Sequence, residues 1–293
     1  MNGASDMGYK IPDRTLFLLV TCSRDTGRRD TAIKVSENLA QKLSELNLSN
    51  RLVTFDNNST YQDHFTELPC GSTLCVSEKN YGYWSAIKWV LDNVGLFNSE
   101  FLEFIYIIES DLVHDDLAPL SECELFLDKT PEASSVRTQE FSVMNRWRYN
   151  KRLSFLPFHV WRSQVSLRNA VTDERVWFKR AEGFSRMYHS NFHAKLPALH
   201  RLNFLKEVFC KLEVKKEFSE KDFFQEMMRM ARQVGVLDGG IYHSLISYLD
   251  RAEVVTGSYG DPKLRNKVGY HNTRKTNIKL YSNNQIIIKK VGS

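Results

Sequence analysis

The sequence feature that most constrains the fold is a short apolar run followed directly by a polar loop, and it recurs. It occurs as TLFLLV before TCSRD (15–20), as RLVTF before DNNST (51–55) and as FIYII before ESD (104–108). Apolar runs of this length bounded by polar residues are typical of buried strands. Charges at the end of such a strand are unfavourable unless they lie at the rim of the sheet. We therefore expect three interior strands, each ending at a solvated rim.

Helical segments stand between these runs. Residues 31–46 place Val35, Leu39, Leu43 and Leu46 on one helical face. A second helix is expected over 85–93, after a further apolar run at 72–79. This alternation predicts an α/β fold, with a mostly parallel sheet flanked by helices. Ligands bind such sheets beyond the carboxyl ends of the strands, which is where the three polar loops fall.

The pattern changes in the second half of the chain. Basic and aromatic loops are followed by expected helices over 199–216 and 220–233, and by a final strand, NQIIIKK, over 284–290. We divide the chain into an α/β half, 1–145, and a helical and loop region, 146–293, within one continuous domain.

Composition excludes several classes of protein. A chain of 293 residues can bury a substantial core, and it has no apolar run of the ~18 residues that a membrane helix needs. Residues 1–14 are polar and lack the apolar centre of a secretory signal. The five cysteines are scattered without a CxxC pair, so neither a zinc site nor a disulfide framework is indicated. We expect a cytoplasmic protein.

Positive charge is concentrated at the end of the sequence. Residues 262–293 carry eight Lys or Arg and no Asp or Glu, within a chain of net charge +5. A second basic stretch, NRWRYNKR, covers 145–152. Both suit an anionic partner, such as a phosphate, a nucleoside diphosphate, nucleic acid or an anionic membrane surface. The alternative is a solvated basic end that aids solubility.

The order of the motifs TFDNNST, SEKNYGYWSAIKWVLDN and FIYIIESDLV resembles the nucleotide-sugar-dependent glycosyltransferases of the GT-A fold, most closely family two. The resemblance covers about residues 15–145. It implies a GT-A, Rossmann-like sheet followed by a helical and loop region on the acceptor side. It also implies inverting transfer of a sugar from a nucleoside-diphosphate sugar to an acceptor hydroxyl.

The resemblance assigns the nucleotide contacts. Thr21 and Arg24 match the loop that contacts base and diphosphate, and Asp56 matches the aspartate that accepts a hydrogen bond from the base. Asn80 and Gly82 match the loop against the ribose or base. The alternatives are ordinary loop residues, an Asx-turn at Asp56 or the next residue, and a simple turn at Asn80.

Glu109 and Asp111 match the acidic metal signature, and Ser110 between them is included in the nucleotide-sugar-binding set. The first acidic residue is Glu here, where the family usually has Asp. We therefore expect Asp111 to bind Mn²⁺ or Mg²⁺, and Glu109 to contact the ribose or a metal-bound water. A hard divalent ion bound to oxygen ligands stabilises the negative charge on a departing diphosphate.

An inverting enzyme also needs a base for the acceptor hydroxyl. The family's second acidic motif starts a helix at about the distance of EFSEKDFFQEMM, so Asp222 is the expected base and Glu220 the second choice. The alternative is structural, because Ser219-x-x-Asp222 is similar to a capping box at a helix start.

A late histidine often adds a metal ligand in GT-A enzymes. His243 is the first choice and His271 the second, although a lone histidine is more often structural. Arg274, with Lys275 beside it, would neutralise the diphosphate from the C-terminal region.

Two other classes of function stay open. A nucleotidyltransferase also uses acidic pairs and a divalent metal on an α/β sheet, and TCSRDTGRR does not exclude it. The other is a non-catalytic binder of anions or nucleic acid on the same fold. For the glycosyltransferase we expect a UDP- or dTDP-type donor, and as acceptor a glycan, a small molecule or a nucleic acid with a hydroxylated base.

Overall fold

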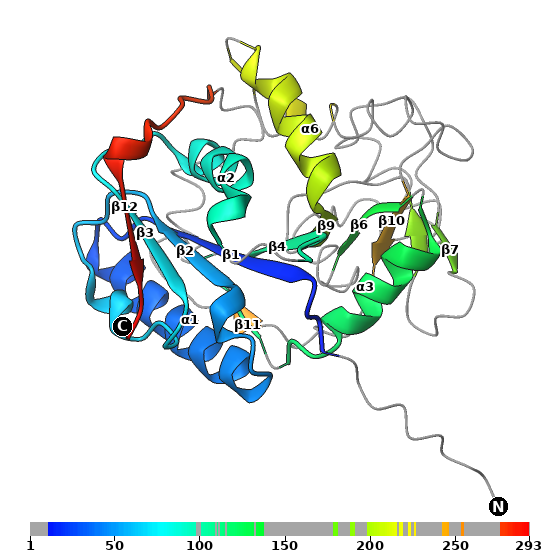
Figure 1. Cartoon of the computed structure of the whole chain (residues 1–293), viewed down its shortest axis with the longest axis horizontal. Helices are drawn as coiled ribbons and strands as arrows, with labels where there is room; N and C mark the ends of the chain where they lie inside the picture. The colour runs from blue at the N-terminus through cyan, green and yellow to red at the C-terminus, as the bar shows by residue number, and fades with distance from the viewer. Residues whose placement is uncertain are drawn as a thin grey trace, which may run out of the picture.

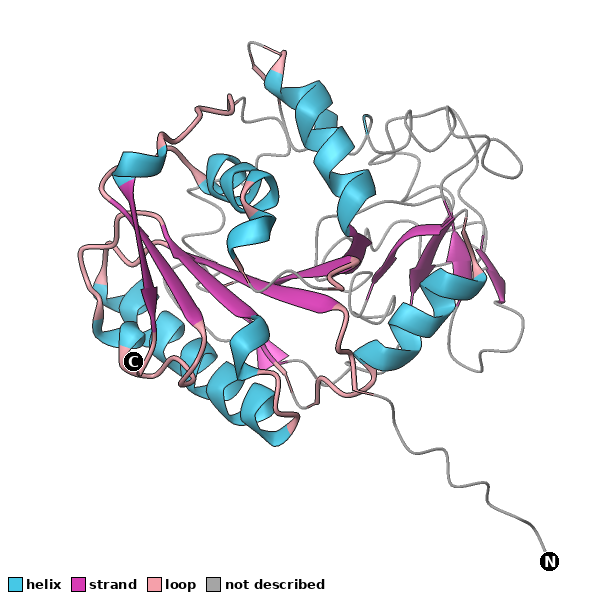
Figure 2. Ribbon diagram, viewed as in Figure 1, coloured by secondary structure: helices cyan, strands magenta, loops and turns pink. Residues whose placement is uncertain are grey.

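A computed structural model gives the fold of the chain. It describes residues 11–97, 101–108, 110, 112–114, 116–131, 133–137, 178–180, 188–190, 198–215, 217–218, 222–223, 226, 242–245, 253–254 and 276–292. One large twisted sheet crosses the molecule, with helices on both of its faces (Figures 1 and 2).

The centre of the sheet is formed by four parallel strands in the order β3-β2-β1-β4. They are β1 (Thr15–Thr21), β2 (Leu52–Asp56), β3 (Thr73–Ser77) and β4 (Phe104–Ile108). Nearly every residue in them is buried, as the apolar runs predicted. This is the beginning of the common doubly wound order, in which the order of the strands in the sheet reverses between β1 and β4. The predicted α/β, Rossmann-like fold is confirmed.

Antiparallel and mixed strands extend the sheet on both sides, in the order β12-β3-β2-β1-β4-β9-β6-β10-β8-β7. The added strands are β6 (Ala133–Arg137), β7 (Phe178–Arg180), β8 (Tyr188–Ser190), β9 (Ala198–Arg201), β10 (Tyr242–Leu245) and β12 (Ile286–Lys290). A separate pair joins β5 (Leu112–Val113) to β11 (Glu253–Val254). The main sheet therefore contains strands from both halves of the chain.

The helices cover both faces of the sheet. α1 lies on one face, while α2 and α6 lie side by side on the other (Figure 1). The helices are α1 (Thr26–Glu45), α2 (Tyr83–Asp92), α3 (Leu120–Lys129) and α6 (Leu202–Glu213), with short 3-10 turns η1 (Ser49–Arg51), η2 (Asp63–Phe65), η3 (Val94–Leu96) and η6 (Asn283–Gln285). Within the described part of the chain, no helix combines the length and the apolar character needed to cross a bilayer.

Two helix starts differ from the prediction by three residues or more. α1 begins five residues before the predicted start at residue 31, because the Asp25 side chain caps it by accepting a hydrogen bond from the backbone N–H of Arg28 (2.9 Å). The helix predicted over 199–216 begins only at Leu202. The residues before it form β9, which pairs with both β4 and β6. Strand pairing there overrides the local helical pattern.

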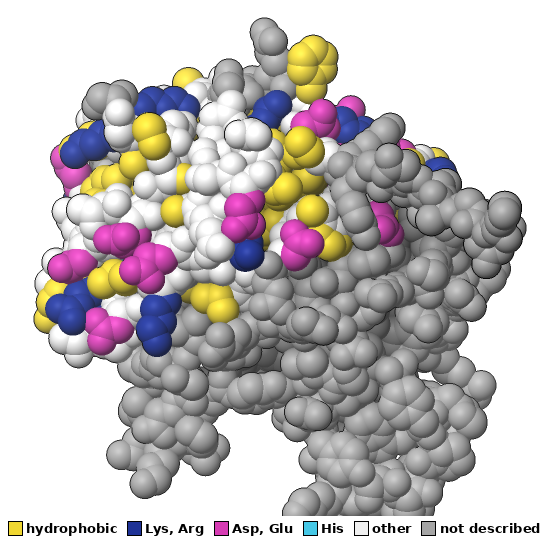
Figure 3. Space-filling model, turned by 90° about the horizontal axis from the view of Figure 1, so that it is seen from below, with side chains coloured by type: hydrophobic (Ala, Val, Ile, Leu, Met, Phe, Trp, Pro, Cys, Tyr) yellow, Lys and Arg dark blue, Asp and Glu magenta, His cyan; other side chains and the backbone are white. Residues whose placement is uncertain are grey.

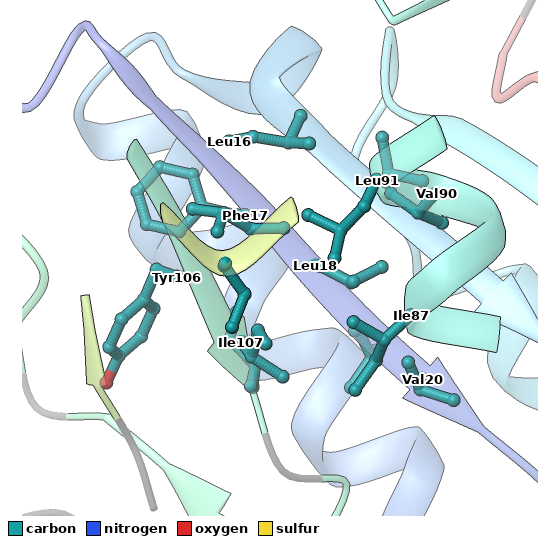
Figure 4. Close-up of a cluster of buried hydrophobic side chains, with 14 of the residues drawn as sticks. Leu16, Phe17, Leu18, Val20, Ile87, Val90, Leu91, Tyr106 and Ile107 are labelled. Carbon is teal, nitrogen blue, oxygen red and sulfur yellow. The ribbon is translucent and has the colours of Figure 1, made fainter. Parts of the chain in front are cut away.

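The core lies on both sides of β1. Leu18 and Val20 point toward Ile87 and Leu91 of α2 (Figure 4), and all four side chains are buried. Phe17 points to the opposite face, as the two-residue period of a strand requires. Each such side chain contributes ~1.5–3 kcal/mol on burial. This packing on both faces fixes the position of the carboxyl end of β1, where the candidate site lies.

The surface seen from below carries charges of both signs. In Figure 3 the coloured acidic and basic side chains are interspersed with hydrophobic ones. A mixed surface of this kind does not by itself attract an anionic ligand. The attraction of an anionic partner was predicted for two basic stretches, 145–152 and 262–293. The first lies outside the described residues, and of the second only 276–292 are described.

Candidate functional site

The carboxyl ends of the parallel strands meet at one edge of the sheet. The last residues of β1 and β2, Thr21 and Asp56, lie opposite each other in the register. The loops that follow are joined directly, because Asn57 N donates to Thr21 O (2.9 Å) and Thr60 N donates to Ser23 O (2.9 Å). Two of the three polar loops predicted to share this edge, those after β1 and β2, therefore form one bonded unit.

Asp56 is a fully buried carboxylate at the centre of this unit. Its Oδ1 accepts hydrogen bonds from Thr21 Oγ1 (3.0 Å) and from Ser59 Oγ, and its Oδ2 accepts one from Ser59 N (3.0 Å). A carboxylate has about four acceptor positions, so one stays open on Oδ2 among the contacts described. Asp56 thus holds its own loop closed, and a contact with a nucleotide base stays a prediction.

His64 completes this buried network, although nothing in the sequence pattern singled it out. Its Nε2 lies 3.2 Å from Thr21 Oγ1 and 3.8 Å from Asp56 Oδ1. Burial lowers the pKa of His64, and the nearby Asp56 carboxylate only partly opposes this. The ring is therefore neutral near pH 7. Because Thr21 donates its own proton to Asp56, Nε2–H must be the donor to Thr21, and the chain of donors runs from His64 through Thr21 to Asp56.

The loop after β3 is connected to the loop after β1. Asn80 Nδ2 donates to Cys22 Sγ (3.0 Å), and Asn80 Oδ1 accepts from Gly82 N (2.8 Å). Gly82 has φ +97° and ψ 164°, a conformation that is essentially restricted to glycine. It directly precedes α2. Two of the predicted residues, Asn80 and Gly82, are thus brought to the same edge as Thr21 and Asp56.

Two arginines place positive charge at this edge. Arg24 is exposed in the loop after β1, close to the half-buried Cys22 thiol. Burial raises the pKa of Cys22, while the charges of Arg24 and Arg28 act against that increase. Arg28 also lies 3.4 Å from the carboxylate of Asp25, which offsets part of the charge. Arg24 is the predicted diphosphate contact that faces solvent.

The C-terminal segment closes the edge from the other side, through a tyrosine that the sequence did not single out. Tyr281 donates its hydroxyl proton to Asn57 Oδ1 (2.6 Å) and accepts from Tyr81 N (3.0 Å). Its ring stacks on that of Tyr81, with centroids 4.7 Å apart. The following strand β12 pairs with β3, and Figure 1 shows this last segment reaching the sheet beside α2.

The loop after β4 is described only in part. Ile108 ends β4 and pairs with Leu19 of β1, so the backbone enters the loop next to the candidate site. Ser110 is half-buried. Glu109 and Asp111 lie outside the described residues, and their roles stay predictions.

The far end of this loop is tightly anchored. Asn38 of α1 donates to His114 O (2.9 Å) and accepts from His114 N (2.8 Å), in the manner of a neighbouring strand. The His114 ring is buried, and its Nε2 lies 3.0 Å from Tyr106 Oη. Burial lowers the pKa of His114 to about 4, so this ring is neutral as well.

The remaining predicted residues are placed less completely. Asp222 is helical and half-buried and already has an interaction partner. His243 lies on β10, while Glu220, His271 and Arg274 lie outside the described residues. Among the residues that the structure describes, no three His, Cys, Asp or Glu side chains gather closely enough to hold a metal ion. Metal binding stays a prediction that depends mainly on Glu109 and Asp111.

Comparisons with known proteins show structural likeness only. No family model and no curated protein matches the sequence. The chain is similar to the structure of S. aureus TarS 1–349, with 13% identity, a TM-score of 0.43, and coverage of 86% of this chain and 64% of that one. It is also similar to mannose-1-phosphate geranyltransferase from Thermus thermophilus, with 11% identity, a TM-score of 0.36, and coverage of 80% and 74%. The chain thus spans less than two thirds of the TarS chain, and likenesses this weak carry no argument about activity.

Proposed function

We propose that the protein is an inverting glycosyltransferase that moves a sugar from a nucleoside-diphosphate sugar to an acceptor hydroxyl with the help of a divalent metal. One observation carries the proposal. The loops after β1, β2 and β3 are hydrogen-bonded into one unit at the carboxyl edge of the sheet. This edge lies at the reversal of strand order between β1 and β4, where α/β proteins bind nucleotides. The acidic Glu109-Ser110-Asp111 sequence follows β4 directly at that reversal.

The described residues support a nucleotide at this edge. Arg24 supplies an exposed cation for the diphosphate, and the Asn80–Gly82 turn presents backbone to the ribose or base. Thr21 and Asp56 are both buried beneath this edge, where their hydrogen bond helps to hold the loop after β2 in place. Asp56 would contact the base through its open Oδ2 position.

The residue types after β4 suit a hard metal ion. Glu109 and Asp111 offer carboxylate oxygens, which Mg²⁺ and Mn²⁺ prefer, and Asp111 would be the direct ligand. His243 or His271 would add a further ligand. When bound, the ion supplies charge neutralisation on the departing diphosphate, and Arg274 would add to it.

The acceptor side is assigned from the sequence alone. Asp222, with Glu220 as second candidate, would take the proton of the acceptor hydroxyl while the sugar is attacked from the face opposite the diphosphate. We propose a UDP- or dTDP-type donor, and as acceptor a glycan, a small molecule or a nucleic acid with a hydroxylated base.

A thermal-shift screen of nucleotide sugars with and without Mn²⁺, followed by a hydrolysis assay, tests the proposal. We expect one donor to raise the melting temperature more with Mn²⁺ than without it, and to be slowly hydrolysed. Asp111→Asn should abolish both effects. Asp116→Asn is the matched control, since Asp116 is exposed and, among the described contacts, accepts a hydrogen bond from Ala118 N (2.9 Å) alone. Equal hydrolysis by wild type and Asp111→Asn would refute the metal assignment, and pyrophosphate release from a nucleoside triphosphate would indicate a nucleotidyltransferase instead.

A further inference from the structure

Tyr281 connects three segments that are far apart in the sequence. Its hydroxyl reaches Asn57, in the loop after β2, and the backbone of Tyr81, in the loop after β3. Its ring packs against Tyr81 and, at 5.4 Å between centroids, against Phe55 of β2. A single side chain from the C-terminal segment therefore contacts two of the loops that form the candidate site, those after β2 and β3.

The hydroxyl is well suited to hold these loops in one arrangement. Only 7% of Tyr281 and 2% of Asn57 are exposed, so water cannot readily replace their bond. Burial raises the pKa of Tyr281, which keeps the hydroxyl protonated as a donor. Its oxygen also accepts from Tyr81 N, so both of its functions as donor and acceptor are used.

Neighbouring contacts fix the segment that carries Tyr281. Lys279 N donates to Ser85 Oγ in α2 (3.0 Å), and Glu78 N donates to Gln285 O (3.1 Å). The Lys279 ammonium lies 5.9 Å from the centre of the Tyr81 ring. These contacts hold the C-terminal segment in a defined position against α2 and the loop after β3.

We propose that Tyr281 is a positioning residue of the donor site, which sets the distance between the loops after β2 and β3 and thereby the affinity for the nucleoside diphosphate. This rests on the proposed function. Asn57 directly follows Asp56, and Tyr81 directly precedes Gly82. A shift of either residue that Tyr281 holds would therefore also displace the adjacent predicted nucleotide contact. The C-terminal segment is then part of the site.

Tyr281→Phe tests the proposal, because it removes the hydroxyl and keeps the ring stack. Binding of UDP, dTDP, GDP, CDP and ADP with MnCl₂ is measured by calorimetry for wild type and variant. We expect the variant to bind the preferred nucleotide about five- to tenfold more weakly, because Asn57 Oδ1 loses its donor and Tyr81 N loses its acceptor. The weaker binding should appear as a raised KM, with a smaller change in kcat.

Thr15→Val is the matched control. It also removes a buried hydroxyl, at the opposite end of β1, whose hydrogen bond runs from Thr15 Oγ1 to Glu124 Oε1 (2.7 Å). It should lower the melting temperature by a similar amount while leaving nucleotide affinity unchanged. If both variants weaken binding equally, general destabilisation explains the effect and the proposal is wrong.

A double-mutant cycle tests whether the effect of Tyr281 on nucleotide affinity passes through its hydrogen bond to Asn57. Asn57→Ala removes the acceptor from the other side, so the loss of affinity in Tyr281→Phe/Asn57→Ala should be smaller than the product of the two single losses. Independent effects would overturn the proposal. If wild type binds none of the nucleotides, the proposed function fails together with this inference. If wild type binds one and Tyr281→Phe binds it equally well, this inference alone fails.

Discussion

Glu124 should make the stability of the protein fall as pH rises. This residue of α3 is 3% exposed, and burial raises the pKa of its carboxyl from 4.5 to about 7. The hydrogen bond from Thr15 and the charge of Arg14 oppose that effect without cancelling it. The folded state therefore binds a proton more tightly than the unfolded state does.

The magnitude follows from the two pKa values. At about 1.4 kcal/mol for each pKa unit, the gap between 4.5 and 7 corresponds to ~3 kcal/mol, which is an upper value for a buried group. This stabilisation is fully present below pH 4.5 and is lost as pH rises through 7. Glu124→Gln carries no charge at any pH. Its amide oxygen can still accept from Thr15 Oγ1 and from Arg14 N.

Urea unfolding of wild type and Glu124→Gln at several pH values between 5 and 8 measures the effect. The comparison of the two proteins is needed because buried His114 and His200, whose pKa burial lowers to about 4, produce the opposite slope below pH 6.5 in both. We expect the free energy of unfolding of the Gln variant, relative to wild type, to increase by ~2–3 kcal/mol from pH 5 to pH 8.

Glu122→Gln is the control, since it removes a charge from a more exposed position of the same helix. It shows how much of any slope comes from net charge alone. A difference between wild type and Glu124→Gln that stays flat from pH 5 to pH 8, or that decreases, would refute the reasoning.

Three further predictions concern single contacts. Tyr106→Phe should lower the free energy of unfolding by ~1–2 kcal/mol in urea titration, because the buried His114 Nε2 loses its partner; no loss would contradict that hydrogen bond. Gly82→Ala should lower the free energy of unfolding by ~1–3 kcal/mol in the same titration. The loss would come from the backbone conformation alone, since nothing lies within 4 Å of an added Cβ, and no loss would contradict the positive φ. Exposed Cys210 should react with iodoacetamide well before Cys22, whose thiol is half-buried and has a raised pKa, and peptide mass spectrometry would detect the reverse order.

The central fold could be predicted from the sequence because local pattern and tertiary environment agree there. The runs that became β1, β2 and β4 are mostly apolar, and such strands fit the interior of a sheet. The same agreement placed the loops after them at one edge. α3 was not predicted. It begins after Pro119 without a side-chain cap, so its start lacks the usual signal.

The candidate site was less predictable because its bonds cross long distances in sequence. Asp56 and Asn80 stand in recognisable loops, whereas His64 and Tyr281 act through partners 43 and 224 residues away. A single tyrosine or histidine has no local signature for such a contact. The alternative interpretation of Asp56, a turn held by its own side chain, describes a bond that is present, Ser59 N to Asp56 Oδ2. A contact between Asp56 and a nucleotide base would need the acceptor position of Oδ2 that no described donor fills, and it stays a prediction.

The pairing of β12 with β3 also bears on how the chain is made. β3 begins at Thr73, yet its outer neighbour ends at Lys290, 217 residues later. During synthesis β3 would therefore stand as an uncovered edge with apolar side chains such as Leu74, and edges of this kind are prone to pair with other chains. When β12 arrives it brings exposed Lys289 and Lys290 to the border of the sheet, and lysines on an edge strand discourage further pairing. The pairing of β12 thus ends a period of aggregation risk that begins when β3 is synthesised.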